Sequence, residues 1–520
     1  MKALDREILR LALPSILANI TVPLVGLVDT AVAGHLHSAA GTGAEFIGGI
    51  SVGALILNVI YWNFAFLRAS TGGLTAQAFG QSAKGMPLKD LSTPGQGQGE
   101  GPIARDGRGR SEQSERSSDR DIPSAHAILQ RALLLAMGIA AGLLVLGWPL
   151  SKLSLLFRSA TPGVAALAAQ YILIRIWAAP ATLSLMVLKG WFIGMQDTFS
   201  SMLTDLTVNI VNIAASIILT LGIGSWQGLG FPGIALGTVI AQWSGLLLAF
   251  VILYFRYRFA LSWKKKVVEG GAFDVEPAMP VPSPSMGEDR PFAGDTKVTT
   301  ASFFRLNADL FIRSLCMTGI YLGYTYIASR YGETMLASAN IMMNLLMIFS
   351  YFTDGFAYAG EALTGRFIGE RNADMLRQSV RGTFRWSFGV AGIWMLIYWL
   401  AGLPLLHLMT DDALLVDACR QFLPWLVVMP LTGCAAFTWD GIYIGATASK
   451  GIRDAMIVAV VAFLGAWFAG CALLPSVRTA GTSGSPALAI HLLMAAYFVH
   501  LLARTAWLSA KYKRDIGAAV

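Results

Sequence analysis

Residues 11–36, LALPSILANITVPLVGLVDTAVAGHL, form an apolar run that is long enough to cross a bilayer as one helix. The run contains Pro14 and Pro23, which each remove a backbone donor and are expected to bend the helix. It also contains one carboxylate, Asp29, about two-thirds of the way along. A lone acid at that depth costs roughly 2.5 kcal/mol or more, so it usually faces the protein interior or a wet cavity. The stretch predicts a bent transmembrane helix that presents one acid inward, as an ion-coupled carrier requires; a purely structural pairing of Asp29 is the alternative.

The composition is that of a polytopic membrane protein. Of the 520 residues, 55% are hydrophobic and 13% are charged, with a mean hydropathy of +0.58. The net charge of +8 is explained by basic cytoplasmic loops, so we expect no nucleic-acid partner. The four cysteines form no C-x-x-C, the histidines form no H-E-x-x-H, and the chain has no G-x-x-x-x-G-K-[ST]. We therefore expect no metal site, no cofactor, no ATP site and no enzymatic activity.

Twelve apolar runs are long enough to be membrane spans. They lie at 8–34, 46–70, 126–150, 165–188, 200–223, 233–256, 305–328, 335–360, 383–406, 418–444, 454–475 and 486–509. Lys and Arg are concentrated in the segments that share a side with both termini, which predicts that the termini are cytoplasmic. The fold expected is an all-α membrane protein.

Two long inner segments interrupt the spans. Residues 84–124 are rich in Gly, Ser and charge, and residues 261–302 contain VEPAMPVPSPSMGEDRP. Neither can bury enough apolar surface to fold alone, so both are expected to be disordered. We therefore predict an N-lobe at 1–260, a linker at 261–302 and a C-lobe at 303–520.

The two halves of the chain share short motifs. LTAQAFG at 74–80 corresponds to LTGRFIG at 363–369, and GWFIG at 190–194 corresponds to GIYIG at 441–445. The two pairs differ in spacing because of the extra loop in the first half. Each half has six spans and starts inside, so we expect parallel six-helix repeats related by an axis along the membrane normal, with a cleft between them.

Polar residues inside the spans of the first half surround Asp29 in our interpretation. Spacings of three and four place Asn209, Asn212 and Ser216 on one helical face. Such amides and hydroxyls are able to hydrogen-bond the acid, although they also serve as contacts between helices. The candidate N-lobe set is Asp29, Asn58, Arg175, Asn209, Asn212, Ser216, Thr238 and Gln242.

The second half offers a different polar set. Asp309 and Arg313 are four residues apart and are expected to pair on one face. Asp354 and Glu361, seven apart, share a face of the eighth span. A gate or a loop anchor is an alternative role for Glu361 and Asp440, which lie nearer the cytoplasmic surface. The candidate C-lobe set is Asp309, Arg313, Asn340, Asn344, Asp354, Glu361 and Asp440.

Four motifs together resemble one transporter family. These are the opening stretch, LRASTGGLTAQAFG at 67–80, DGFAYAGEALTGRFIGERN at 354–372 and WDGIYIGAT at 439–447. They resemble the multidrug and toxic compound extrusion (MATE) family, in its DNA-damage-inducible F (DinF) branch. The resemblance implies a carrier of two six-helix lobes that exports organic cations or other toxic compounds in exchange for H⁺ or Na⁺. It also implies that Asp29, which matches the acid of the family's first helix, takes part in coupling.

The sequence departs from the family pattern at two positions. The family often has a second acid on helix five in an N-x-x-x-D pattern, where this chain has Asn212 and Ser216. The sodium-binding acid that other branches carry on helix seven has no clear match, because span seven offers Asp309 and Arg313 instead. These departures leave the coupling ion open between H⁺ and Na⁺.

Three functions compete at this stage. We favour a secondary antiporter for drug-like compounds, acting as a monomer in the bacterial cytoplasmic (inner) membrane, with a small organic substrate and the lipid bilayer as partners. A lipid or lipid-linked oligosaccharide flippase shares the architecture, but it should need a large cationic cavity. An intramembrane prenyl transferase would need paired acids for Mg²⁺ at a cytoplasmic helix end, and none is evident.

Overall fold

The first half of the chain folds into a bundle of helices. The structure is a computed structural model that describes residues 2–34, 36, 42–83, 111–157, 162–257, 300–410, 412–474, 477 and 486–517. The helices of the first half are α1 (Lys2–Gly34), α2 (Gly43–Asn63), α3 (Phe66–Ser82), α4 (Ser111–Val145), α5 (Gly147–Ser151), η2 (Lys152–Phe157), α6 (Pro162–Arg175), η3 (Ile176–Ala178), α7 (Ala179–Gly194), α8 (Thr198–Leu221) and α9 (Phe231–Tyr257).

The second half repeats this plan with longer helices. They are α11 (Thr300–Ser329), α12 (Glu333–Gly369), α13 (Ala373–Met409), α14 (Ala413–Arg420), α15 (Leu423–Gly445), α16 (Ser449–Leu473) and α18 (Pro486–Asp515). Among the described residues, eleven stretches are long and apolar enough to cross a membrane. The helix pairs α2/α3 and α6/α7 each count once in that set, and the more polar α11 supplies a twelfth span. The prediction of an all-α protein with twelve spans is confirmed.

One expected disordered region is partly helical. Residues 111–124, which we assigned to the loop 84–124, form the first turns of α4. The composition argument excludes a packed core for this segment. It does not exclude a helix that continues a transmembrane helix, and Glu, Gln and Arg are good helix formers. Residues 84–110, and residues 261–299 of the predicted linker, lie outside the described residues.

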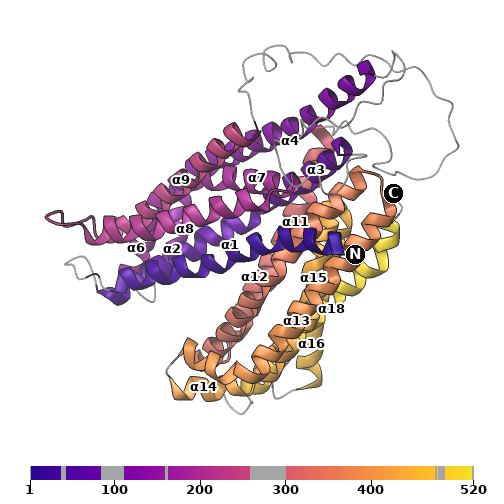
Figure 1. Cartoon of the computed structure of the whole chain (residues 1–520). Helices are drawn as coiled ribbons and strands as arrows, with labels where there is room; N and C mark the ends of the chain where they lie inside the picture. Colours follow the sequence, from indigo (N-terminus) through magenta and orange to yellow (C-terminus); the bar gives the residue numbers. More distant parts are fainter. Residues whose placement is uncertain are drawn as a thin grey trace.

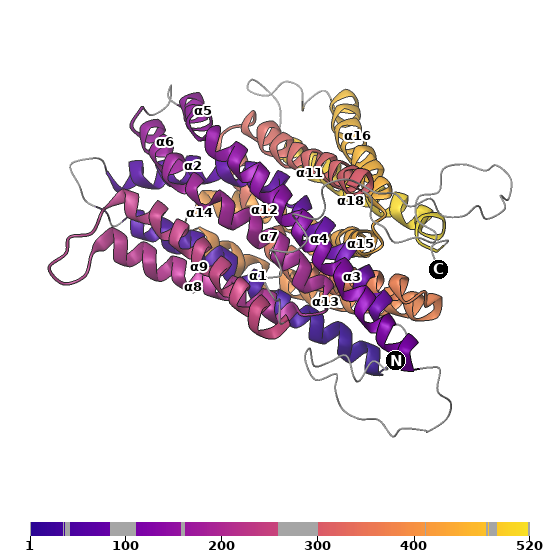
Figure 2. The same cartoon turned by 90° about the horizontal axis from the view of Figure 1, so that it is seen from above.

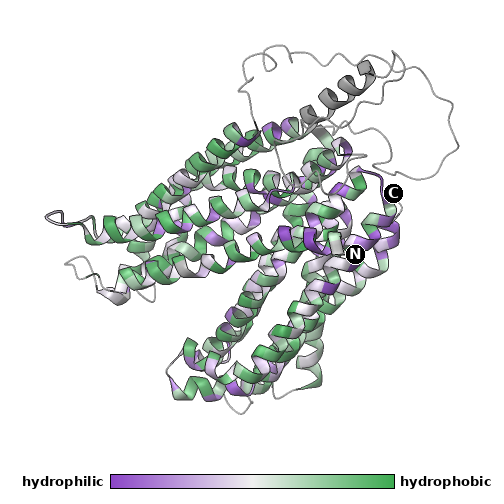
Figure 3. Cartoon of the chain, viewed as in Figure 1, coloured by the Kyte–Doolittle hydropathy of each residue, from purple (hydrophilic) through white to green (hydrophobic). Residues whose placement is uncertain are grey.

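The two halves form two lobes that meet at one end and diverge at the other (Figure 1). Both termini lie at the end where the lobes meet, which we call the convergent end. In both views α8 and α9 lie on the opposite side of the molecule from α16 and α18 (Figures 1 and 2). Hydrophilic residues gather toward the convergent end, whereas the shafts of the helices are mostly hydrophobic (Figure 3). This distribution fits helices whose outer faces contact lipid.

Helix α1 connects the two lobes along most of its length. Its Asp5 forms an ion pair with Arg385 of α13 at the convergent end. Because Pro14 has no backbone N–H, the carbonyl of Arg10 does not receive its usual helical hydrogen bond. The hydroxyl of Thr198 on α8 donates to that carbonyl instead, at 3.5 Å. Further along, the side chain of Asn19 donates to the carbonyl of Tyr351 on α12 at 3.3 Å.

The two repeated G-x-x-x-G motifs make equivalent contacts inside their own lobes. A Cβ atom on Gly190 of α7 would collide with the carbonyl of Arg68 on α3. A Cβ atom on Gly441 of α15 would collide with the carbonyl of Ala357 on α12. Arg68 and Ala357 stand at the same position relative to their own Leu-Thr motifs. The sequence repeat is therefore a structural repeat, in which glycine permits two helix backbones to touch.

Helices α3 and α12 cross at the boundary between the lobes, and they do so reciprocally. A Cβ atom on Gly80 would collide with the carbonyl of Arg366, and one on Gly369 would collide with the carbonyl of Gln77. Gly80 matches Gly369 in the repeat, and Gln77 matches Arg366. A contact in which each partner uses the same surface is the mark of a two-fold relation, here between two halves of one chain.

We predict that the crossing of α3 and α12 does not tolerate a side chain. Gly80→Leu should push the helices apart and lower the thermal stability of the purified protein, by about 1–3 kcal/mol or more. Gly389→Leu on α13 is the matched control, because no atom lies within 4 Å of a Cβ atom built there. The measurement is the melting temperature in detergent together with the monodisperse fraction in size-exclusion chromatography. Equal stability of the two variants would contradict the contact.

Candidate functional site

Helix α8 presents a polar stripe to the interior of the N-lobe. Its start is fixed by Asp197, whose side chain caps the helix by accepting from the backbone amide of Ser200 at 3.2 Å. From that start, every fourth residue is buried: Ser200, Thr204, Val208, Asn212, Ser216 and Thr220. A Cβ atom on Gly237 of α9 would collide with Ser216, so α9 packs closely against the stripe.

Asp29 of α1 is buried in the N-lobe, with a relative exposure of 6%. Its polar neighbours are Ser216 of α8 and Arg175 of α6. Neither Oδ1 of Asp29 nor Oγ of Ser216 has a hydrogen-bond partner among the described residues. A buried carboxylate oxygen without a donor is rare in folded proteins and calls for an explanation.

Arg175 is held by Tyr171 and lies near a second tyrosine. It donates to the hydroxyl of Tyr171 at 2.8 Å, and its guanidinium carbon lies 5.5 Å from the centre of that ring. Tyr61 of α2 is a further electrostatic neighbour of Arg175. Our sequence analysis did not include Tyr171 in the site. The signal was present, because Tyr171 and Arg175 are four residues apart on one helix face.

The predicted amides separate into two groups. Asn212, which belongs to the polar stripe of α8, donates to Thr238 of α9 at 2.9 Å. Asn209 instead donates to Thr21 of α1 at 2.5 Å. Asn58 is exposed and Gln242 is partly exposed. Neither side chain has a hydrogen bond or ion pair to the other described residues of this set. The structure therefore brings together Asp29, Arg175, Asn212, Ser216 and Thr238, with Tyr61 and Tyr171.

The expected pair between Asp309 and Arg313 does not form. Asp309 of α11 accepts from Ser449 at 2.8 Å and from Arg453 at 2.7 Å, both on α16. Arg313 instead forms an ion pair with Asp440 of α15. The prediction from helical spacing was wrong because buried acids on neighbouring helices compete for the same arginine, and a buried charge is costly without a partner.

Asp440 is held between two arginines. Besides the ion pair with Arg313, it forms one with Arg504 of α18, whose Nε lies 3.1 Å from Oδ1. Arg504 is 1% exposed and was absent from our predicted set. Its position in the last span gave a signal, because a cation at that depth needs an acidic partner.

The acids of α12 face the boundary between the lobes. Glu361 is fully buried and forms an ion pair with Arg68 of α3 at 3.0 Å. Asp354 is partly exposed, and Arg68 is also its electrostatic neighbour. Asn340 and Asn344 lie nearer the diverging end of α12, where neither side chain has a hydrogen bond to another described residue.

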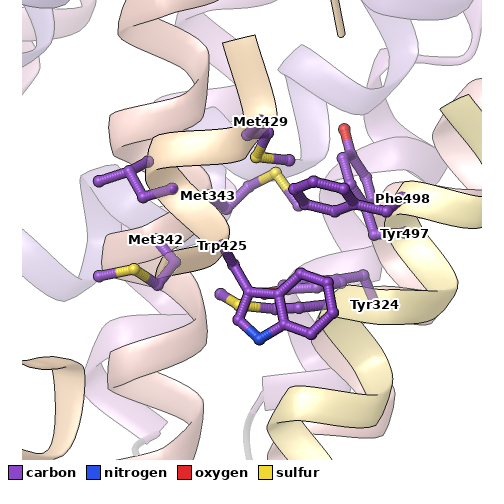
Figure 4. A pocket seen from close by; sticks show the side chains of 9 residues that line it. Tyr324, Met342, Met343, Trp425, Met429, Tyr497 and Phe498 are labelled. Atoms are coloured by element: carbon purple, nitrogen blue, oxygen red, sulfur yellow. The ribbon is translucent and has the colours of Figure 1, made fainter. Parts of the chain in front are cut away.

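A small apolar cavity lies inside the C-lobe (Figure 4). The side chains that converge on it come from α11, α12, α15 and α18. They are Tyr324, Met342, Met343, Trp425, Leu426, Met429, Met494, Tyr497 and Phe498. Methionines fill irregular gaps with little strain, so this cavity is best understood as packing within the C-lobe.

Comparisons with known proteins agree with this architecture. A family model for MatE matches residues 117–218 and 310–470. DNA damage-inducible protein F of Escherichia coli is 30% identical over 459 residues, which cover 88% of this chain and 84% of that protein. The chloroplastic protein DETOXIFICATION 44 of Arabidopsis thaliana is 22% identical over 92% of this chain and 78% of its own length.

Solved structures with this fold are also similar. An outward-facing multidrug resistance MATE transporter of the MOP superfamily superposes with a TM-score of 0.72 at 16% identity, over 99% of this chain and 96% of that one. A MATE structure in the bent conformation gives a TM-score of 0.70 at 16% identity, over 100% and 97% of the two chains.

We predict that Asp440 is a structural clamp. Asp440→Asn leaves the buried Arg504 and the partly buried Arg313 without their acid, and breaking a buried ion pair from one side costs about 3–5 kcal/mol. The variant should show a much lower melting temperature and yield than wild type. Asp374→Asn is the control, because Asp374 pairs with Arg377 on the surface and its side chain is 84% exposed. Wild-type stability of Asp440→Asn would show that the arginines do not depend on this acid.

Proposed function

Since this chain belongs to the MatE family of membrane transporters, a family of multidrug and toxic compound efflux, we propose that it is a secondary antiporter that exports an organic cation in exchange for H⁺. Asp29 is the proposed coupling acid of the N-lobe. The single observation that carries this proposal is the buried Asp29 carboxylate, which forms no ion pair with a described residue and whose Oδ1 accepts no hydrogen bond, although the Ser216 hydroxyl lies beside it. A proton on that oxygen would neutralise the buried charge, and the Ser216 hydroxyl is able to donate to the charged acid or to accept from the protonated one.

The position of Asp29 suits alternating access. It lies near the end of α1 that reaches the diverging part of the lobes, whereas α1 begins at the convergent end (Figure 1). The acid is therefore on the side where the lobes are apart, and the contacts between lobes are at the other side. A carrier in this state receives a proton from the diverging side, and rocking of the lobes would expose the same acid to the opposite side.

The small number of oxygen ligands in the N-lobe cluster favours H⁺ over Na⁺. Asp29 is the acid of the cluster, with Ser216 and Arg175 beside it. A sodium ion would need several oxygen ligands, whereas a proton binds to one oxygen. An organic cation and a proton would then compete for the same carboxylate, and this competition produces exchange.

A flippase for phosphate-linked lipids is less well supported. Such a substrate needs arginines that are free to bind phosphate. In the described residues, Arg68, Arg313 and Arg504 each form an ion pair with an acid, so their charges are already matched. We further propose that the protein acts as a monomer in the bacterial cytoplasmic membrane, with the convergent end and both termini in the cytoplasm, as the Lys and Arg distribution predicts.

We predict that Asp29→Asn folds normally and loses gradient-driven export. The change keeps the shape of the side chain but removes its titration. Wild-type protein in vesicles with an imposed pH gradient should accumulate a fluorescent organic cation against its gradient, and the variant should fall to the level of empty vesicles. An imposed Na⁺ gradient is the second arm, and Asp374→Asn is the control. Wild-type accumulation by Asp29→Asn would remove Asp29 from the mechanism, and accumulation driven only by Na⁺ would overturn the choice of H⁺.

A further inference from the structure

One face of α12 carries three residues that lie along the lobe boundary. Asp354, Tyr358 and Glu361 follow one another at spacings of four and three, which aligns them on the helix. Arg68 of α3 lies against this face. Its Nη1 is 3.0 Å from Oε2 of Glu361, and its guanidinium carbon is 4.5 Å from the centre of the Tyr358 ring. A cation of the N-lobe is thus held on a helix of the C-lobe.

The two acids on this face differ in their surroundings. Glu361 is fully buried, and a Cβ atom on Gly72 of α3 would collide with its Oε1. Asp354 is partly exposed, and no described side chain forms a hydrogen bond or ion pair with it. Asp354 is therefore partly accessible and has no bonded partner among the described residues, whereas Glu361 is packed in and already paired.

Other charged groups also face Asp354, and their effects partly cancel. Asp440 acts on it from α15, and its charge is matched by its own arginine partners. The remaining charged and titratable neighbours are Arg313 of α11, Arg504 of α18, and Tyr351 and Tyr358 of α12 itself. Arg68 is the neighbour that comes from the opposite lobe, so the charge on Asp354 acts on the contact between lobes mainly through Arg68.

We propose that Asp354 is a second coupling acid, which controls the closure of the convergent end through Arg68. While Asp354 is charged and empty, it helps Glu361 to hold Arg68 against α12. A proton or an organic cation on Asp354 cancels that attraction and lets the end open. This inference rests on the proposed antiport, and it adds a reason why the empty carrier does not turn over.

The sign of the effect follows from Coulomb attraction between opposite charges. Protonation of Asp354 removes a favourable interaction with Arg68, so the convergent end is held most firmly at high pH and loosens as the pH falls. The pair between Arg68 and Glu361 remains in both cases, so the change is graded. An antiporter needs its empty form to be restrained in this way, because return of the empty carrier would dissipate the ion gradient without export.

A cysteine at Ser70 reports the opening of the convergent end. Ser70 is 2% exposed, lies on α3 close to Arg68, and donates to Asn307 of α11 across the boundary at 2.8 Å. The experiment uses Ser70→Cys in a full-length chain whose four native cysteines are replaced, placed in lipid nanodiscs so that both sides are accessible. The measured quantity is the rate of reaction with an impermeant maleimide, divided at each pH by the rate for a small free thiol, because only the thiolate reacts and its fraction changes with pH. This normalised rate is followed across about pH 4 to 8, a range that covers the ordinary carboxyl pKa and its upward shifts at buried sites.

We expect the normalised rate to rise in the wild-type background as the pH falls. Asp354→Asn should react several-fold faster than wild type at high pH and should lose the pH dependence. Arg68→Gln should react faster still and should also lose the pH dependence, because it removes the pair with Glu361 as well; adding Asp354→Asn to it should change nothing further. Glu361→Gln should also react faster but should keep a pH dependence, because Asp354 remains. Asp374→Asn, on the exposed start of α13, should match wild type.

Wild-type reactivity and pH dependence in Asp354→Asn would overturn the inference. So would additive effects of Asp354→Asn and Arg68→Gln, because they would show that the two residues act separately. Asp354→Asn removes no hydrogen bond or ion pair of the described residues, so its folding should be normal by size-exclusion chromatography. The readout does not use transport. If Asp29→Asn keeps its export while these reactivities appear as expected, the proposed role of Asp29 fails and the closure by Asp354 stands.

Discussion

The reciprocal backbone contact between α3 and α12 is the constraint on which the two-lobed structure depends. Gly80 touches the carbonyl of Arg366, and Gly369 touches the carbonyl of Gln77. The contact is made by equivalent residues of two repeats in the last turns of both helices, so it holds the lobes together at the convergent end. Side chains around it then cross the boundary with polar contacts, such as Gln77 to the carbonyl of Gly445 at 3.1 Å. A rocking motion that opens this end has to break these contacts.

Buried charge explains most of the remaining polar architecture. In a membrane protein an unpaired ion is costly, and most of the buried acids found here lie beside arginines: Glu361 with Arg68, Asp440 with Arg313 and Arg504, and Asp309 with Arg453. Asp29 and Asp354 differ from these acids, since neither forms an ion pair with a described residue. They lie in different lobes, and each is able to bind a proton or a cation without breaking a pair.

Much of the fold follows from the sequence because each span depends on the total hydropathy of about twenty residues and not on any single contact. The spans are set by the cost of exposing polar backbone to lipid, so hydropathy located all twelve, and the repeated motifs revealed the two halves. The burial of Asp29 followed from its place in an apolar run.

The ion-pair partners of individual charged residues did not follow from the sequence, because they depend on which helices meet. Asp309 and Arg313 satisfied the spacing rule for a pair, yet each found a better partner on another helix, and Arg504 and Tyr171 entered the clusters from helices whose neighbours the sequence does not specify. The helix at 111–124 shows a further limit, since composition excludes a core and leaves local helix formation open.

In the proposed mechanism, one set of helices presents buried acids alternately to the two sides by rocking of the lobes. Spin–spin distances between the lobes test it most directly. One pair of labels would join Trp226, between α8 and α9, to Leu414 of α14 at the diverging end, since both side chains are exposed. A second pair would join α1 and α13 at the convergent end, near Asp5 and Arg385. We expect that lowering the pH shortens the first distance while it lengthens the second. Distances that stay constant at all pH values, or that change in the same direction at both ends, would contradict it.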